Sequence, residues 1–293
     1  MRSRRTPRII WLLLAAVLAV GAWLRFVRLA DRGLLFFDEG VYVLAGRFLY
    51  GWWLQLAHQG WAAAQAYLAH ADQWMGVPLA TANPAYRVLG LLAMLAAGGT
   101  DPYALLWVNA FCSTLSLVVV YALGRRCFDA WVGVVASALL AVSVYHLMYA
   151  RSALAEAATT LWFLAACGVL MSGHVQRGAP SWHRSVLGGL CGGVAFLSNC
   201  RLWMIPLCLW VVAWWRLQGE GRLTARRRAV PLALLTLGML APVIVWIGLE
   251  AVVMRGLPAD IPRYPQELVL RYLKHGTGWM LREWYAYPYL LAA

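Results

Sequence analysis

Long apolar runs separated by short polar connections dominate the chain. The first run extends over residues 9–24, and runs of 21 residues follow at 104–124, 130–150, 153–173 and 229–249. At about 1.5 Å per helical residue, roughly 20 apolar residues cross the ~30 Å hydrocarbon core of a bilayer. The pattern therefore predicts an all-α polytopic membrane protein. The first run has the basic start and the length of a signal peptide, but Arg25 and Arg28 follow it, so we expect an uncleaved span.

A 30-residue apolar stretch, 186–215, carries the letters SNCR (Ser198–Arg201) at its centre. As one helix it would be about 45 Å long, too long for a bilayer. As two spans, 186–199 and 202–215, each segment is about 21 Å long, so the turn would lie below the outer surface. Asn199 and Arg201 would then sit at membrane depth, where a polar cavity is needed to accommodate them.

Composition and charge support the two-segment interpretation. The chain is 62% hydrophobic and 13% charged, and all but one of its 25 basic residues are Arg, with a net charge of +13. Two short segments place the basic stretch 216–228 on the side of the N-terminus, as the positive-inside rule requires. We therefore expect about seven spans in the inner (plasma) membrane, a cytoplasmic N-terminus, contacts with membrane lipids and no nucleic-acid partner.

Two predicted outer loops are long, 25–103 and 250–293. The first is rich in Trp and Tyr, which predicts helices lying in the outer membrane interface. The chain ends WYAYPYLLAA, similar to the first turns of a further span. We expect residues 1–293 to form a single transmembrane module that is truncated at its C-terminus.

Polar side chains from separate spans gather on the predicted outer face. Asp38 and Glu39 follow the first span, and the third and fourth spans meet there. The other candidates are Tyr42, Asn83, His146, Arg151, Glu156, Asn199, Arg201 and Lys274. This set suits transfer from a lipid-phosphate donor, because a carboxylate can take a proton from an acceptor hydroxyl. Arg or Lys can hold a phosphate leaving group.

Each candidate also has a structural interpretation. Asp38 and Glu39 can simply pair with Arg28 or Arg32, and Arg151 can pair with Glu156. His146 can be a packed residue at the membrane interface. No cofactor is certain. Asp38 and Glu156 could share a divalent cation through oxygen ligands, although the spacing does not demand one. The six Cys contain no CxxC pair and are interpreted as small apolar residues.

The order of these segments resembles the C-type membrane glycosyltransferases (the GT-C superfamily), and above all family 39. That family includes protein O-mannosyltransferases and aminoarabinose transferases of lipid A. The stretch RLADRGLLFFDEGVYVLAGR is similar to their first outer loop. YALGRRCFDAWVGVVASALLAVSVYHLMYARSALAEAATTLWFLA is similar to their second to fourth spans, and GGLCGGVAFLSNCRLWMIPL to their fifth and sixth. The likeness covers roughly residues 20 to 250.

The resemblance implies a polyprenyl-phosphate sugar donor, with a protein, lipid or glycan as acceptor. It maps the catalytic outer-loop carboxylate onto Asp38 and an acidic residue at the start of the fourth span onto Glu156. The family often has a basic residue or His before paired prolines in the first loop. This chain has ANPAY there instead, with Asn83 and a single Pro.

Helical geometry separates the two adjacent carboxylates. In a helix Asp38 and Tyr42 share a face, while Glu39 is turned away by ~100°. We expect Asp38 to act on the acceptor and Glu39 to pair with an Arg such as Arg28 or Arg151. The alternatives to a glycosyltransferase are a transporter or lipid-carrier flippase, whose broken helix would carry the site, and an inactive truncated scaffold.

Overall fold

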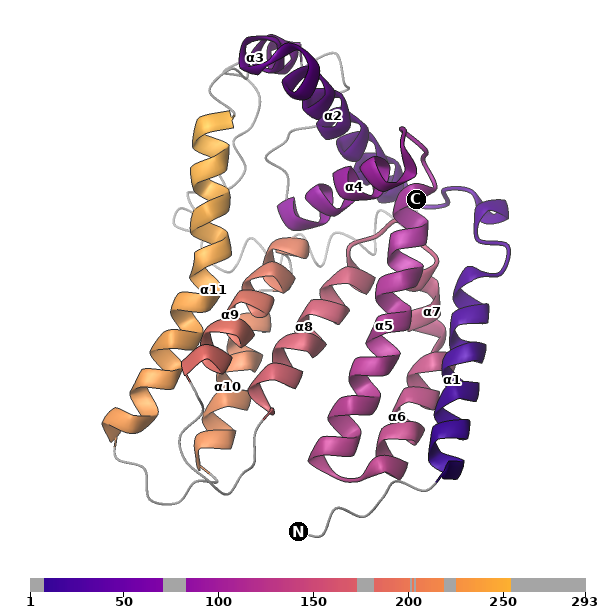
Figure 1. The fold of residues 1–293 in the computed structure, drawn as a ribbon, viewed down its shortest axis with the longest axis vertical. Helices are drawn as coiled ribbons and strands as arrows, with labels where there is room; N and C mark the ends of the chain where they lie inside the picture. The colour runs from indigo at the N-terminus through magenta and orange to yellow at the C-terminus, as the bar shows by residue number, and fades with distance from the viewer. Residues whose placement is uncertain are drawn as a thin grey trace, which may run out of the picture.

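The structure is a computed structural model that describes residues 8–70, 83–172, 182–200, 202, 204–218 and 225–253. Every regular element in these ranges is helical. Figure 1 shows α1, α5, α6, α8, α9 and α10 running side by side, with α2, α3 and α4 placed across one end of this bundle. The fold is thus that of an all-α membrane protein, as the apolar runs predict.

Within the described residues, the bundle is built from eight helices. Their bounds are α1 Arg8–Phe26, α5 Ala104–Cys127, α6 Ala130–Val142, α7 Val144–Ala150, α8 Glu156–Leu170, α9 Trp182–Ser198, α10 Met204–Gln218 and α11 Ala225–Val253. By length and composition, α1, α5 and α11 can each cross a membrane, and α6 with α7 adds a fourth crossing if the bent pair counts as one span. Helices α8 and α10 are apolar but shorter. The count of seven spans stays a prediction.

The predicted span 130–150 is wrong as a single helix. It breaks at Ser143, and α6 and α7 are bent by 64° relative to one another. The predicted fourth span also begins later than expected, because residues 151–155 form a turn before α8 starts at Glu156. The stretch around SNCR forms two helices, α9 and α10, and not one long helix.

The first long loop contains the helices that its aromatic composition predicts. A short 3-10 turn, η1 Ala30–Arg32, leads into α2 Phe37–Gln59, α3 Trp61–Ala69 and α4 Pro84–Ala97. Pro84 at the first position suits the start of α4, and Gly98 ends it in the left-handed conformation. One hydrophobic cluster joins α2, α4, α5 and the turn before α8, so this layer packs onto the bundle.

Small residues allow the bundle helices to approach closely. Helix α9 lies between α8 and α11, and the buried residues Gly188, Gly189, Gly192 and Gly193 lie along it. A Cβ built on Gly238 of α11 would lie 3.1 Å from the Cα of Gly189. Close backbone approach at small residues is a common mode of helix association in membranes.

Candidate functional site

Glu39 is the buried anchor of the first loop. Its side chain is 0% exposed and forms an ion pair with Arg32, in which Nη1 lies 2.8 Å from Oε1. Backbone N–H groups of Leu35, Phe36 and Ala153 donate to the same carboxylate at 2.7, 2.9 and 2.7 Å. Because Ala153 lies in the turn before α8, Glu39 fastens the loop to the bundle. Its partner is Arg32, as the structural interpretation of the sequence allowed, and not Arg28 or Arg151.

The protonation of Glu39 follows from these contacts. Burial alone would raise the pKa of this carboxyl, but the hydrogen bonds from Arg32, Phe36, Ala153 and Leu35 outweigh burial and hold the pKa below its ordinary value. The carboxylate also lies in the first turn of α2, where it accepts from backbone N–H groups and interacts favourably with the helix dipole. Glu39 is therefore ionised at neutral pH, and both its carboxylate oxygens are occupied by structural hydrogen bonds.

Asp38, in the same helical turn, differs from its neighbour in burial and in contacts. It is half-buried, and among the residues that the structure describes it has no hydrogen-bond or ion-pair partner. Residues 37–59 are helical, so Tyr42 shares its helix face and Glu39 is turned away. The two carboxylates are thus separated into one that is held and one that is free to meet a ligand.

Asn83 joins three segments that are distant in sequence. Its Nδ2 donates to the Tyr42 hydroxyl of α2, and its Oδ1 accepts from the backbone N–H of Cys200 at 2.9 Å. Asn83 is 2% exposed. The turn between α9 and α10 therefore lies beside the first loop, as predicted for polar groups delivered to one face. Asn199 in this turn is buried, and its Oδ1 has no partner among the described residues. Arg201 and Lys274 lie outside the described residues.

Tyr86 of α4 extends this polar layer toward α8. Its ring meets that of Tyr42 edge-on, with centroids 4.9 Å apart, and its hydroxyl accepts from Asn109 Nδ2 at 2.8 Å. Burial raises the pKa of Tyr86 well above its ordinary value, the Asn109 hydrogen bond acts the other way, and the charges of Tyr42 and Glu156 raise it further. Glu156 therefore lies within electrostatic reach of this layer, to which the sequence assigns it.

Arg151 and His146 belong to a neighbouring region. The Arg151 guanidinium donates to the carbonyls of Leu24 and Val27, both at 2.9 Å, and so satisfies acceptors at the end of α1. His146 Nδ1 lies 3.0 Å from Arg25 Nη2. Among the described residues, the ion pairs that the structure gives do not include one between Arg151 and Glu156. Their proposed roles toward a substrate stay predictions.

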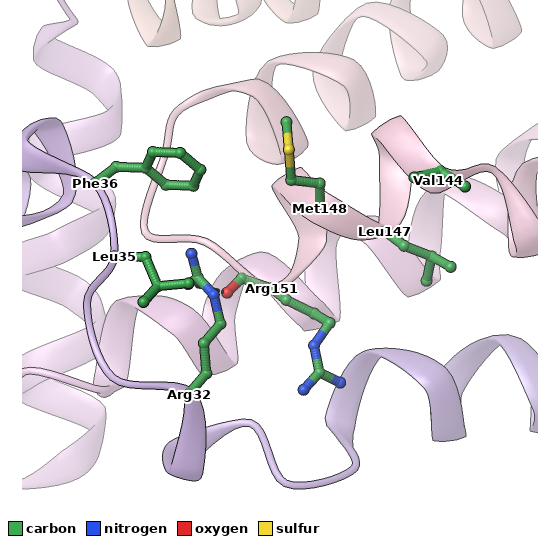
Figure 2. A pocket seen from close by; sticks show the side chains of 7 residues that line it. All are labelled: Arg32, Leu35, Phe36, Val144, Leu147, Met148 and Arg151. Carbon is green, nitrogen blue, oxygen red and sulfur yellow. Dashed lines mark hydrogen bonds between the residues drawn. The ribbon is translucent and has the colours of Figure 1, made fainter.

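An apolar groove lies where the first loop meets α7. Its volume is about 300 Å³, and its lining comprises Arg32, Leu35, Phe36, Val144, Leu147, Met148 and Arg151. Figure 2 shows Leu35 and Phe36 on one side and Leu147 and Met148 on the other, with the two Arg between them. Because Phe36 is two residues before Asp38, the groove borders the segment that carries the free carboxylate.

Two buried arginines were not anticipated from the sequence. Arg25 of α1 is 0% exposed, and Arg87 of α4 is 2% exposed and lies one helical turn after Asn83. The sequence signal that could have identified them is an Arg in an apolar helix: Arg25 lies near the end of α1, and Arg87 lies within α4. Among the described residues, no group of three or more His, Cys, Asp or Glu side chains could hold a metal ion.

Comparison with known protein families identifies the chain. The family model for dolichyl-phosphate-mannose-protein mannosyltransferases matches residues 86–246, more than half of the sequence. The chain belongs to this mannosyltransferase family. No curated protein and no solved structure matches it.

The family match begins within α4 and ends within α11. It includes His146, Arg151, Glu156 and Asn199, whereas Asp38, Glu39 and Asn83 lie before it. Membership of this mannosyltransferase family makes the chain a multi-pass membrane glycosyltransferase. The role of the first loop rests on its contacts with the matched region, chiefly those of Glu39 with Ala153 and of Asn83 with Cys200.

Proposed function

We propose that this protein transfers a sugar from a polyprenyl-phosphate-linked donor to an acceptor hydroxyl on the outer face of the membrane. The observation that carries the proposal is the contrast between the two carboxylates at the start of α2. Glu39 is buried and bound by four donor groups, whereas Asp38 is half-buried and has no partner among the described residues. A carboxylate that makes no such contact, next to a residue that fixes the loop, is available to accept a proton from an acceptor hydroxyl.

The chemical step follows from these positions. The Asp38 carboxylate takes the proton of the acceptor hydroxyl while the oxygen attacks the anomeric carbon of the donor sugar. The bond between that carbon and the phosphate oxygen breaks, and its electron pair leaves with the polyprenyl phosphate. Arg87, one helical turn after Asn83, and Arg201 of the SNCR sequence are the proposed partners of the departing phosphate.

The groove of Figure 2 is the proposed path of the donor's lipid chain. Its exposed walls are apolar, and Leu35, Phe36 and Val144 are among the most exposed apolar residues of the region, at 67, 42 and 78%. Transfer of such surface from water to hydrocarbon contributes about 25 cal/mol per Å². The acceptor is a protein, lipid or glycan that enters beside Tyr42.

The end of the bundle opposite the first loop is the proposed cytoplasmic end. Figure 1 shows the start of α1, the end of α5, the end of α10 and the start of α11 at this end. The described basic residues of these termini and of the start of α9 are Arg8, Arg125, Arg126, Arg184, Arg216, Arg226, Arg227 and Arg228, and among the described residues Asp129 is the one carboxylate beside them. The end that carries Asp38 has acidic and basic residues in similar number. This asymmetry supports a cytoplasmic N-terminus, and hence an outward-facing site.

A transfer assay in sealed vesicles tests the proposal. The chain is reconstituted with a polyprenyl-phosphate mannose whose sugar is labelled, and peptide, lipid or glycan acceptors are supplied. Appearance of labelled acceptor together with free polyprenyl phosphate is the expected result. Movement of the labelled lipid across the bilayer without any product would instead identify a lipid-carrier flippase, and the proposal would be wrong.

A further inference from the structure

Arg25 uses its whole guanidinium inside the bundle. It lies on α1, and its side chain is 0% exposed. Its five N–H donors have five acceptors: Ser113 Oγ at 2.6 Å, the Gly21 carbonyl at 2.8 Å, the Ala141 carbonyl at 3.1 Å, the Leu140 carbonyl at 3.3 Å and His146 Nδ1 at 3.0 Å. Because an Arg guanidinium has five donors and no acceptor, no donor remains for a substrate phosphate.

These contacts lie at the break between α6 and α7. A continuous helix would use the N–H groups of residues 144 and 145 to satisfy the carbonyls of Leu140 and Ala141, but the 64° bend at Ser143 removes those partners. Arg25 donates to both carbonyls in their place. The Ser143 side chain accepts from the N–H of His146 at the start of α7. The Ser143 N–H also donates to the Leu140 carbonyl, at 3.4 Å. The break is thus stabilised from α1 in addition to these local hydrogen bonds of Ser143.

The charge of Arg25 makes this arrangement costly. All five acceptors are neutral groups, and none of the described carboxylates contacts it. A buried cation without a counter-ion is expensive in a membrane bundle, where ionisable residues mostly mark functional positions. An apolar residue at position 25, with a continuous helix at 140–146, would avoid that cost. We infer that the bend itself is needed.

Helix α7 connects this bend to the carboxylates. It is seven residues long, and both its ends are bound to α1. Arg25 holds its beginning, and Arg151, which follows its end, donates to Leu24 and Val27. The Arg151 carbonyl in turn accepts from Arg32, and the Ala153 N–H donates to Glu39. The position of α7 therefore determines where Glu39, and with it Asp38, is held.

We propose that Arg25 is a positioning residue for the reaction. It holds the bend between α6 and α7 so that residues 151–153 reach Glu39 and Asp38 meets the acceptor. This inference rests on the proposed function, but it concerns a residue far from the reacting atoms. A displacement of about 1 Å in a catalytic group can cost about 10²-fold in rate.

The kinetic test compares Arg25→Gln and Arg25→Lys with a matched control, Arg28→Gln. Arg28 lies three residues further on, and its side chain is 84% exposed. At equal protein level Arg25→Gln should lower kcat by about 10²-fold, with little change in the KM for the donor. Arg25→Lys keeps the charge but has three donors for five acceptors, so it should recover only part of the rate. Arg28→Gln should match the native protein.

A distance measurement tests, without relying on turnover, whether Arg25 holds the bend between α6 and α7. Spin labels are placed at Val20 of α1 and Val144 of α7, because both positions are exposed. Arg25→Gln should shift or broaden this distance, while the distance between labels at Val20 and Leu115 of α5 stays as it is. Ser113→Ala, which removes one acceptor, should give a smaller change and remain folded if Arg25→Gln does not.

Three results would overturn the inference. One is an unchanged α1–α7 distance in both Arg25→Gln and Ser113→Ala. Another is a raised donor KM with native kcat, which would make Arg25 a donor ligand. The third is additive loss of rate in the double variant Arg25→Gln, Asp38→Asn. If Arg25 acts through Asp38, this double variant should be no slower than Asp38→Asn alone. If the native protein transfers no sugar, the proposed function fails. The distance between α1 and α7 still shows whether Arg25 holds the bend.

Discussion

At the scale of single residues, the two adjacent carboxylates differ in their contacts: Glu39 is held by four donor groups, whereas Asp38 has no partner among the described residues. Their helical offset was predictable, since consecutive helical residues point about 100° apart. The partner of Glu39 was not predictable. Arg28, Arg32 and Arg151 were all candidates in the sequence, and the contact of Arg32 with the turn before α8 selects it. Arg25 was missed for a related reason. An Arg ending an apolar run is typical of an interfacial anchor, and the distant break in α6–α7 is what buries it.

The ion pair of Glu39 predicts a stability effect. Glu39→Gln leaves the Arg32 charge, which is 13% exposed, without its counter-ion, and should lower the free energy of unfolding by on the order of 3 kcal/mol. Asp31→Asn is the control, because its pair with Arg28 is long, 3.9 Å, and exposed. Thermal unfolding in detergent measures both. Equal midpoints for the two variants would show that Glu39 does not anchor the loop.

The same carboxylate predicts a pH dependence. The pKa of Glu39 is lower in the folded protein than its ordinary value of 4.5, so the folded state favours the ionised form. Its contribution is fully present above pH 4.5 and is lost as the pH falls through the folded-state pKa. Between pH 7 and pH 4 the native protein should lose more stability than Glu39→Gln does. Parallel losses would contradict the assignment.

At the scale of helices, apolar runs predicted α1, α5 and α11 closely, but they could not place the break at Ser143. Residues 130–150 contain no Pro, and their one Gly packs against α5, so the local signal is limited to Ser143, a residue type that often caps a helix start. The bend also depends on hydrogen bonds from another helix. The meeting of Asn83 with the α9–α10 turn was predictable as a shared face, whereas its exact partners depend on tertiary packing.

The glycine contacts between α9 and α11 predict the effect of adding a methyl group. Gly189→Ala would force its Cβ into α11, 2.9 Å from the Cα of Gly238, and should destabilise the protein by about 1–3 kcal/mol. Gly248→Ala on α11 is the matched control, because nothing lies within 4 Å of that Cβ, and it should be neutral or slightly stabilising. The unfolding midpoints of the two variants should therefore move in different directions or by clearly different amounts.

At the scale of the whole molecule, the distribution of Arg predicts topology. Phe128, just after α5, is 75% exposed at the Arg-rich end, and Thr100, before α5, is exposed at the end that carries Asp38. In a cysteine-free background, an impermeant thiol reagent should label Thr100→Cys in intact cells and Phe128→Cys only after lysis. Labelling of Phe128→Cys before lysis would invert the proposed orientation and place the site inside.

The most direct test of the account is the turnover of Asp38→Asn compared with Glu39→Gln, each measured with a polyprenyl-phosphate sugar at equal amounts of folded protein. Removal of a general base typically costs 10²–10⁴-fold in rate, or roughly 3–5 kcal/mol of barrier. Asp38→Asn should lose turnover by about that factor and keep native donor binding, while folded Glu39→Gln loses far less. Near-native turnover in Asp38→Asn would show that both carboxylates only anchor the loop.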